Sequence, residues 1–133
     1  MALGDHYLRS YTVDAEARTI SFVAVYKDAS PYDVADATFR GVEGYHFERD
    51  NLGTILLDVR ELPLDEFIAT EREALEAGRV FAWPDLWNRD DATLATFVRE
   101  NSGLRAYYLE SAVGMEGWVL AERFDVRYRD AVI

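Results

Sequence analysis

A chain of 133 residues that is 50% hydrophobic and has no cysteine fits one globular domain over residues 1–133, and it excludes a disulfide framework, iron–sulfur ligation and thiol catalysis. The 14 Lys and Arg against 25 Asp and Glu give a formal net charge of −11, so a phosphate backbone would be repelled and no nucleic-acid partner is expected. The longest apolar run, residues 22–26, is too short for a membrane span, and the start lacks a signal-peptide pattern, so we expect no membrane partner and a cytoplasmic location.

The first half of the chain alternates with the period of two that is typical of half-buried strands. We expect strands over residues 7–13, 19–26, 38–48 and 54–60. The second of these is apolar on both faces, which predicts an interior strand. Residues 27–37 contain Pro31 and three Asp and predict a surface loop. Gly41 and Gly44 interrupt the third strand and indicate a bulge or a close backbone approach.

Helical spacing begins after Pro63, and Gly78 is placed to end the helix. Four apolar residues on one face define its buried stripe: Leu64, Phe67, Ile68 and Leu75. Residues 81–87 form an aromatic connector, in which Pro84 disfavours a regular helix. A second helix is expected to start at Asp90 or Asp91 and to end before Gly103.

The last third returns to strand patterns. Residues 105–111 and 116–123 predict two strands, joined by a hairpin connection over residues 112–115. Residues 124–129 alternate apolar and charged side chains and either extend the second of these strands or follow a break. The chain order is thus four strands, two helices, then two or three strands. It predicts an α+β fold with a twisted, mainly antiparallel sheet of about six strands and two helices on one face.

The sequence carries no motif for catalysis or for a cofactor. His6 and His46 are too far apart to form a helical zinc-binding pair, and no serine lies in a G-x-S-x-G motif. No glycine loop of the phosphate-binding kind is present, and no acidic segment has the order of a calcium loop. We therefore expect no metal, no cofactor and no catalytic residue, and we favour a protein that is not an enzyme.

One carboxylate stands out because it interrupts an apolar strand. Asp58 lies in phase with Arg60, so it either faces water or shares a covered face with that cation. Glu43 could join such a pair. A structural carboxylate is the favoured interpretation, because ion pairs often resemble functional sites.

Aromatic residues give the strongest basis for a binding site. The candidates are the three tryptophans together with neighbouring strand residues: Trp83, Trp87, Trp118, Tyr45 and His46. Tryptophan and tyrosine are enriched at interfaces because each combines an apolar body with a polar tip. Packing of these rings in the core is the favoured interpretation, and a presented patch is the alternative.

Two functions from different classes remain open. The first is a protein-interaction domain whose negative surface engages a basic protein, a general character shared with the bacterial immunity proteins that neutralise basic nucleases. The alternative is a small-molecule-binding or enzymatic domain with a pocket between sheet and helices. Tyr45, Trp83 and Trp118 would line that pocket, and Asp58 or His46 would supply its polar group. The chain is expected to be a monomer or a homodimer joined through the edge strand at residues 124–128.

Overall fold

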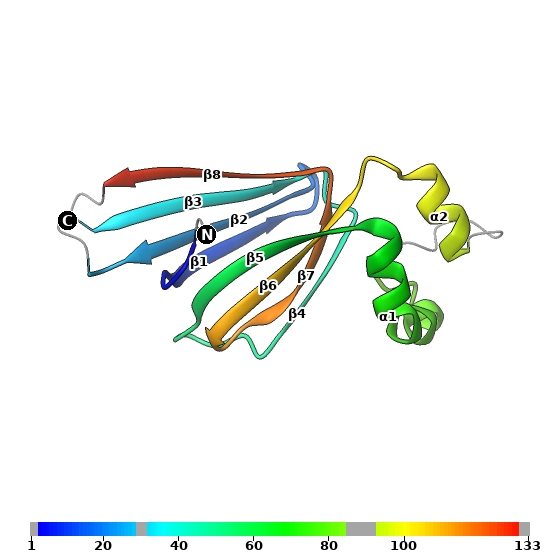
Figure 1. Ribbon diagram of the computed structural model, residues 1–133, viewed down its shortest axis with the longest axis horizontal. Helices are drawn as coiled ribbons and strands as arrows, with labels where there is room; N and C mark the ends of the chain where they lie inside the picture. The colour runs from blue at the N-terminus through cyan, green and yellow to red at the C-terminus, as the bar shows by residue number, and fades with distance from the viewer. Residues whose placement is uncertain (1–2, 29–31, 85–92, 131–133) are drawn as a thin grey trace.

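The computed structural model describes residues 3–28, 32–84 and 93–130. It has an α+β fold in which one antiparallel sheet is combined with two α-helices and one 3-10 helix (Figure 1). The predicted fold class is therefore confirmed. The predicted strand number and chain order are wrong, because the described residues form eight strands, five before the helices and three after them.

Five strands precede the helices: β1 (Tyr7–Asp14), β2 (Thr19–Tyr26), β3 (Asp33–Arg40), β4 (Gly44–Glu48) and β5 (Ile55–Pro63). The helices follow as α1 (Leu64–Gly78), the 3-10 helix η1 (Arg79–Phe81) and α2 (Leu94–Glu100). The chain then completes the sheet with β6 (Arg105–Val113), β7 (Glu116–Ala121) and β8 (Arg123–Asp130).

The sheet has two halves that fold toward each other. Its strand order is β4-β7-β6-β5-β1-β2-β3-β8, which makes β4 and β8 the edges and confirms the interior position of β2. The halves join at β1 and β5, which pair in register only at Tyr7 opposite Ile55 within the described residues. Figure 1 shows β1, β2, β3 and β8 along one side and β5, β6, β7 and β4 along the other.

The main core lies between the two halves. Side chains alternate between the faces of each strand, so one face of every strand contributes to this core. Phe22 and Phe39 of the first half lie edge to face with ring centroids 5.5 Å apart, and Phe39 is 5.6 Å from Tyr107 of the second half. Phe22 and Phe39 are fully buried, and such aromatic pairs hold the halves together.

The helices lie at one end of the sheet (Figure 1), where their buried residues pack against the outer face of β6 and β7. The predicted stripe of α1 is confirmed, because its four residues are buried in a second cluster with Ala106, Trp118 and Leu120 of the strands. Phe67 packs edge to face on Trp118 with ring centroids 4.8 Å apart. Burial of each large stripe residue contributes about 1.5–3 kcal/mol before entropy is subtracted.

The predicted loop over residues 27–37 is wrong in its second part. Strand β3 begins at Asp33 and pairs with both β2 and β8. Its acidic residues are compatible with a strand because they lie where solvent and cations reach them: Asp36 accepts hydrogen bonds from Arg129 at 2.6 and 3.3 Å. The predicted strand over residues 38–48 is two strands, since the chain crosses between the halves at Gly41 and Val42.

The second half of the chain differs from the prediction mainly at its helix. Helix α2 begins at Leu94, where the Thr93 side chain accepts a hydrogen bond from the Thr96 backbone N–H at 3.0 Å. The predicted start at Asp90 or Asp91 is therefore wrong, and those two residues lie outside the described ranges. The predicted β6–β7 hairpin is confirmed, and the chain breaks at Glu122 before β8.

Candidate functional site

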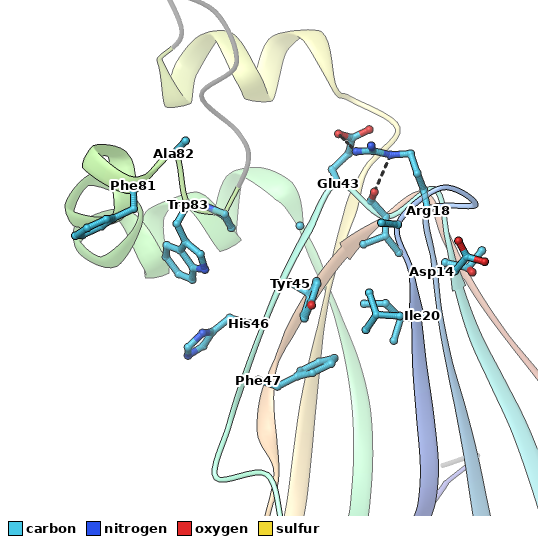
Figure 2. Close-up of a pocket in the computed structure, with 16 residues that line it drawn as sticks. Asp14, Arg18, Ile20, Glu43, Tyr45, His46, Phe47, Phe81, Ala82 and Trp83 are labelled. Carbon is cyan, nitrogen blue, oxygen red and sulfur yellow. Dashed lines mark hydrogen bonds and ion pairs between the residues drawn. The ribbon is translucent and has the colours of Figure 1, made fainter.

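Strand β4 divides its side chains between the two faces of its half of the sheet. Tyr45 and Phe47 point inward, and Phe47 meets the Tyr11 ring of the opposite half at a centroid distance of 5.6 Å. His46 points outward and lies 5.5 Å from the Trp83 ring. Figure 2 shows this division, with His46 on the side of Trp83 and Tyr45 and Phe47 on the other. The short edge strand therefore borders two different environments.

The outer environment is built on aromatic rings. Trp118 is only 3% exposed and lies 6.0 Å from His46 and 5.8 Å from Trp83. Trp83 is half-buried, because the chain reverses at Ala82 in a left-handed conformation (φ 53°) and the Trp83 N–H donates to the carbonyl of Gly78 at 3.0 Å. Trp118 is therefore packed in the core, whereas part of the Trp83 ring is exposed to solvent.

A groove of about 560 Å³, here called the outer groove, lies beside these rings between α1 and strands β4, β7, β6 and β5. Four carboxylates line it: Glu48, Glu71, Glu110 and Glu116. Among the described lining residues, Arg60 is the arginine, and Tyr108, Trp83 and Trp118 contribute aromatic faces. The outer groove is therefore negatively charged and aromatic.

Two carboxylates of the outer groove each accept a hydrogen bond through one oxygen. Glu71 Oε1 accepts a hydrogen bond from the Tyr108 hydroxyl, and Glu110 Oε1 accepts one from Arg60 Nε, both at 2.9 Å. The second oxygen of each has no hydrogen-bond partner within the described ranges. Burial, and then the hydrogen bond to Glu71, raises the pKa of Tyr108, so its hydroxyl remains a neutral donor. Glu71 and Glu110 are thus positioned and still able to accept from a ligand.

The remaining polar groups of the outer groove have structural partners. The Ser111 hydroxyl is hydrogen-bonded to the Met115 carbonyl, and Arg49 is paired with Glu116. His46 Nε2 lies 3.7 Å from a Glu48 oxygen. Among the described residues, no group of three or more His, Cys, Asp and Glu could hold a metal ion. The arrangement suits recognition of a cation, because carboxylates and aromatic faces both attract positive charge.

A second groove of about 610 Å³, here called the edge groove, follows β4 on the other side of His46. It lies between the β1–β2 turn and residues 81–84 (Figure 2). Arg18 closes one end: its Nε donates to the Val42 carbonyl at 3.1 Å and its Nη2 donates to Glu43 at 3.0 Å. Tyr45 is 39% exposed in this groove.

The structure brings together four of the residues singled out in the sequence. Tyr45, His46, Trp83 and Trp118 all lie at β4, and His46 lies opposite Trp118 in the strand register. They do not form the single predicted pocket, because Tyr45 lines the edge groove and Trp118 lines the outer groove. Trp87 lies outside the described residues.

Asp58 lies apart from this cluster on β5, opposite Glu110, and it lines neither groove. The pair with Arg60, one of the two alternatives for Asp58, is not formed, because Arg60 reaches across the register to Glu110. Glu43 pairs with Arg18 instead. Asp58 Oδ1 is buried without a hydrogen-bond partner among the described residues. Asp58 and His46 therefore do not share a site.

The carboxylates of the outer groove were missed in the sequence, although strand alternation carried a signal. Glu48 follows His46 by two positions, Glu110 follows Tyr108 by two, and Trp118 follows Glu116 by two. Residues two apart in a strand share a face. Strand alternation alone therefore places an acidic residue beside His46, Tyr108 and Trp118 on the same face.

Comparisons with known proteins do not place the chain in a family. No family model matches it, and no curated protein has a significantly similar sequence. Of the helices in the described ranges, none combines the length and the apolar character needed to cross a bilayer. The chemistry of the two grooves is therefore the basis for a functional proposal.

Proposed function

We propose that this chain is a non-catalytic binding protein whose outer groove receives basic side chains of a partner protein. The observation that carries the proposal is that one groove is lined both by the second carboxylate oxygens of Glu71 and Glu110 and by the half-buried ring of Trp83. An inhibitor or immunity-type role toward a basic protein is the kind of function this chemistry supports.

Arginine is the side chain that matches the outer groove best. Its guanidinium is planar, has several N–H donors that can reach separate carboxylate oxygens, and stacks on aromatic faces. Glu71 and Glu110 offer the carboxylate oxygens, and Trp83 and Tyr108 offer the rings. A lysine would match less well, because its ammonium is a strongly hydrated point charge.

The net charge of the chain supports the same partner class. A formal charge of −11 raises the encounter rate with a positively charged protein through long-range attraction, and salt screens that attraction. Half-exposed carboxylates around the outer groove concentrate the effect: the Glu48, Glu110 and Glu116 side chains are 50%, 46% and 44% exposed. Association is therefore expected to be fast and sensitive to ionic strength.

The test uses an octa-arginine peptide titrated into the protein, with tryptophan fluorescence as the readout. A double variant, Glu71→Gln with Glu110→Gln, removes the groove charges and is expected to weaken binding about tenfold, or about 1.4 kcal/mol. The matched control, Glu73→Gln with Glu76→Gln, makes the same change in net charge on exposed positions of α1. Its affinity is expected to stay close to that of the wild type. Equal losses in both variants, or no binding to the wild type, would contradict the proposal.

A second candidate function is the binding of a small organic cation. The volume of about 560 Å³ favours it, because pockets for small molecules fall between roughly 300 and 1,000 Å³. Spermidine is a suitable probe, and a rise in melting temperature that disappears in the Glu71 and Glu110 double variant would support this candidate. An unchanged melting temperature at saturating spermidine would leave the protein partner as the proposal.

A further inference from the structure

Among the described residues, nothing pairs with the free side of β4, which offers its backbone groups to a partner. β4 is the last strand of the sheet and has β7 as its neighbour on one side. A Cβ added to Gly117 of β7 would lie 1.9 Å from the His46 carbonyl oxygen, which shows that His46 directs its backbone toward β7. Neighbouring residues of a strand direct their backbone groups to opposite sides. The N–H and C=O of Tyr45 and Phe47 therefore face away from β7.

Those backbone groups open into the edge groove. Within the described part of the chain, neither Tyr45 nor Phe47 has a backbone hydrogen bond to any segment outside the sheet. The groove has one wall on each side of the strand. Val13 and Ile20 line it on the inner side, and Trp83 and Pro84 on the outer side. Figure 2 shows β4 between Ile20 on one side and Trp83 on the other.

The two sides of β4 differ in chemistry. On the inner side, Tyr45 and Phe47 lie with the apolar residues of the β1–β2 turn. On the outer side, His46 borders the acidic and aromatic outer groove. The side chains of an added strand would alternate between these environments, since successive residues of a strand point to opposite faces. Apolar residues match the inner side, and basic residues match the outer side.

From this arrangement we propose that the partner binds by adding an extended segment to the free edge of β4, with basic residues alternating with apolar ones. The inference rests on the proposed function, because the outer groove is the site that would receive the basic residues. Main-chain hydrogen bonds to Tyr45 and Phe47 would supply affinity, and the alternating side chains would supply specificity. The added segment of the partner would span the 5 residues of β4.

The first residue of β4, Gly44, lies close to Pro84 in the outer wall of the edge groove. A Cβ at Gly44 would come 2.9 Å from the Pro84 carbonyl oxygen, which confirms the close approach predicted for this glycine. At the other end, Phe47 packs on Tyr11, whose hydroxyl donates to Asp50 at 2.5 Å. Both ends of β4 are thus fixed, which keeps the edge in place for pairing without a large rearrangement.

The test compares octapeptides of identical composition on the wild-type protein. One alternates arginine and valine, and the other has its four arginines followed by its four valines. The alternating peptide is expected to bind at least about tenfold more tightly, and to slow amide hydrogen exchange at Tyr45 and Phe47. Two N-methylated forms of the alternating peptide, methylated at odd or at even positions, are expected to differ by at least about tenfold, since only alternate amides face β4.

A variant of the protein gives an independent test. Tyr45→Pro removes the N–H on the free side while leaving the pairing with β7 intact, and Tyr45→Ala is the matched control for loss of the ring. The proline variant is expected to bind the alternating peptide at least about tenfold more weakly than the alanine variant. If the proline variant does not fold, the two methylated peptides decide the question on the wild-type chain.

The outcomes separate this inference from the function on which it rests. Equal binding of the alternating and grouped peptides, with unchanged exchange at Tyr45 and Phe47, would overturn strand addition and leave the basic partner standing. Absence of binding to every basic peptide, octa-arginine included, would overturn both. Protection of the same two amides by concentration-dependent self-association would identify a second copy as the occupant and would also overturn the inference.

Discussion

The two edge strands of the sheet protect their free sides in different ways. β8 presents charged side chains at alternate positions, and two of them are tied to β3: Asp125 pairs with Arg40 at 3.1 Å, and Arg129 pairs with Asp36 at 2.6 Å. β4 has apolar Tyr45 on its inner side and no such row of charges. Its free side is instead enclosed by the walls of the edge groove.

This difference shows how one sheet can have a closed edge and a selective one. A row of charges repels most strands that approach, which is a common protection of exposed edges. Walls act differently, because they admit only a segment of suitable length and side-chain pattern. The comparison predicts that changes at β4 alter binding, whereas matched changes at β8 alter stability or solubility alone.

The largest effect is expected from removing the aromatic anchor of each edge. Phe47 packs on Tyr11, and Phe124 of β8 packs on Phe39 at a centroid distance of 4.6 Å. Phe47→Ala and Phe124→Ala should each lower the free energy of unfolding by about 3 kcal/mol in urea titrations. Only Phe47→Ala should also weaken peptide binding under conditions where both variants are folded. Equal losses of affinity would remove the distinction between the edges.

A smaller effect is expected at the outer wall of β4. Trp83→Ala removes the half-buried ring beside His46 and should weaken binding of the alternating peptide about tenfold, as measured by isothermal titration calorimetry. Val80→Ala serves as the control, because Val80 is 86% exposed and lines neither groove. Unchanged affinity for Trp83→Ala would exclude the wall from recognition.

A pH-dependent effect is expected where β4 ends. The hydrogen bond to Asp50, and then burial, raises the pKa of Tyr11 from 10.0 to about 12. The folded state holds this proton more tightly than the unfolded state, so the contribution is complete below pH 10 and is lost as pH rises from 10 to about 12. Tyr11→Phe should therefore lose less stability over this range than the wild type, measured by urea unfolding. Parallel curves would show that this bond does not hold β4.

The smallest effect on stability is expected at β8. Arg127 is exposed on the edge strand, and Arg127→Val should change the free energy of unfolding by no more than about 0.5 kcal/mol. The same change should increase self-association, seen by sedimentation velocity, because it removes a protecting charge from the edge. If the Arg127→Val protein remains monomeric, the other charges of β8 are sufficient to protect this edge.

Local patterns in the sequence predicted much of the fold. The stripe from Leu64 to Leu75 predicted α1, and the apolar residues on both faces of residues 19–26 predicted an interior strand, because both patterns report burial directly. β3 was underpredicted because Asp33 and Asp36 resemble loop composition, although Asp33 lies at the strand end beside His6 and Asp36 pairs with Arg129 on the outer face. The length of α2 depended on a cap at Thr93 that competes with nearby Asp residues for the same role.

The candidate site was less accessible to sequence reasoning. His46 and Trp118 meet because β4 pairs with β7 in one particular register, and no local pattern fixes a register between strands so far apart in the chain. Trp83 joins them through the reversal at Ala82. The acidic neighbours Glu110 and Glu116 were within reach of alternation alone, but their convergence with Glu71 of α1 depended on helix placement.

Two-dimensional NMR of the uniformly 15N-labelled protein with the alternating peptide bound shows directly whether the peptide lies along β4. Binding along the free edge of β4 should place the largest shifts on the amides of Tyr45 and Phe47 and on the Trp83 indole N–H, with β8 unaffected. Shifts confined to the exposed face of α1, or spread evenly over all acidic surfaces, would contradict it.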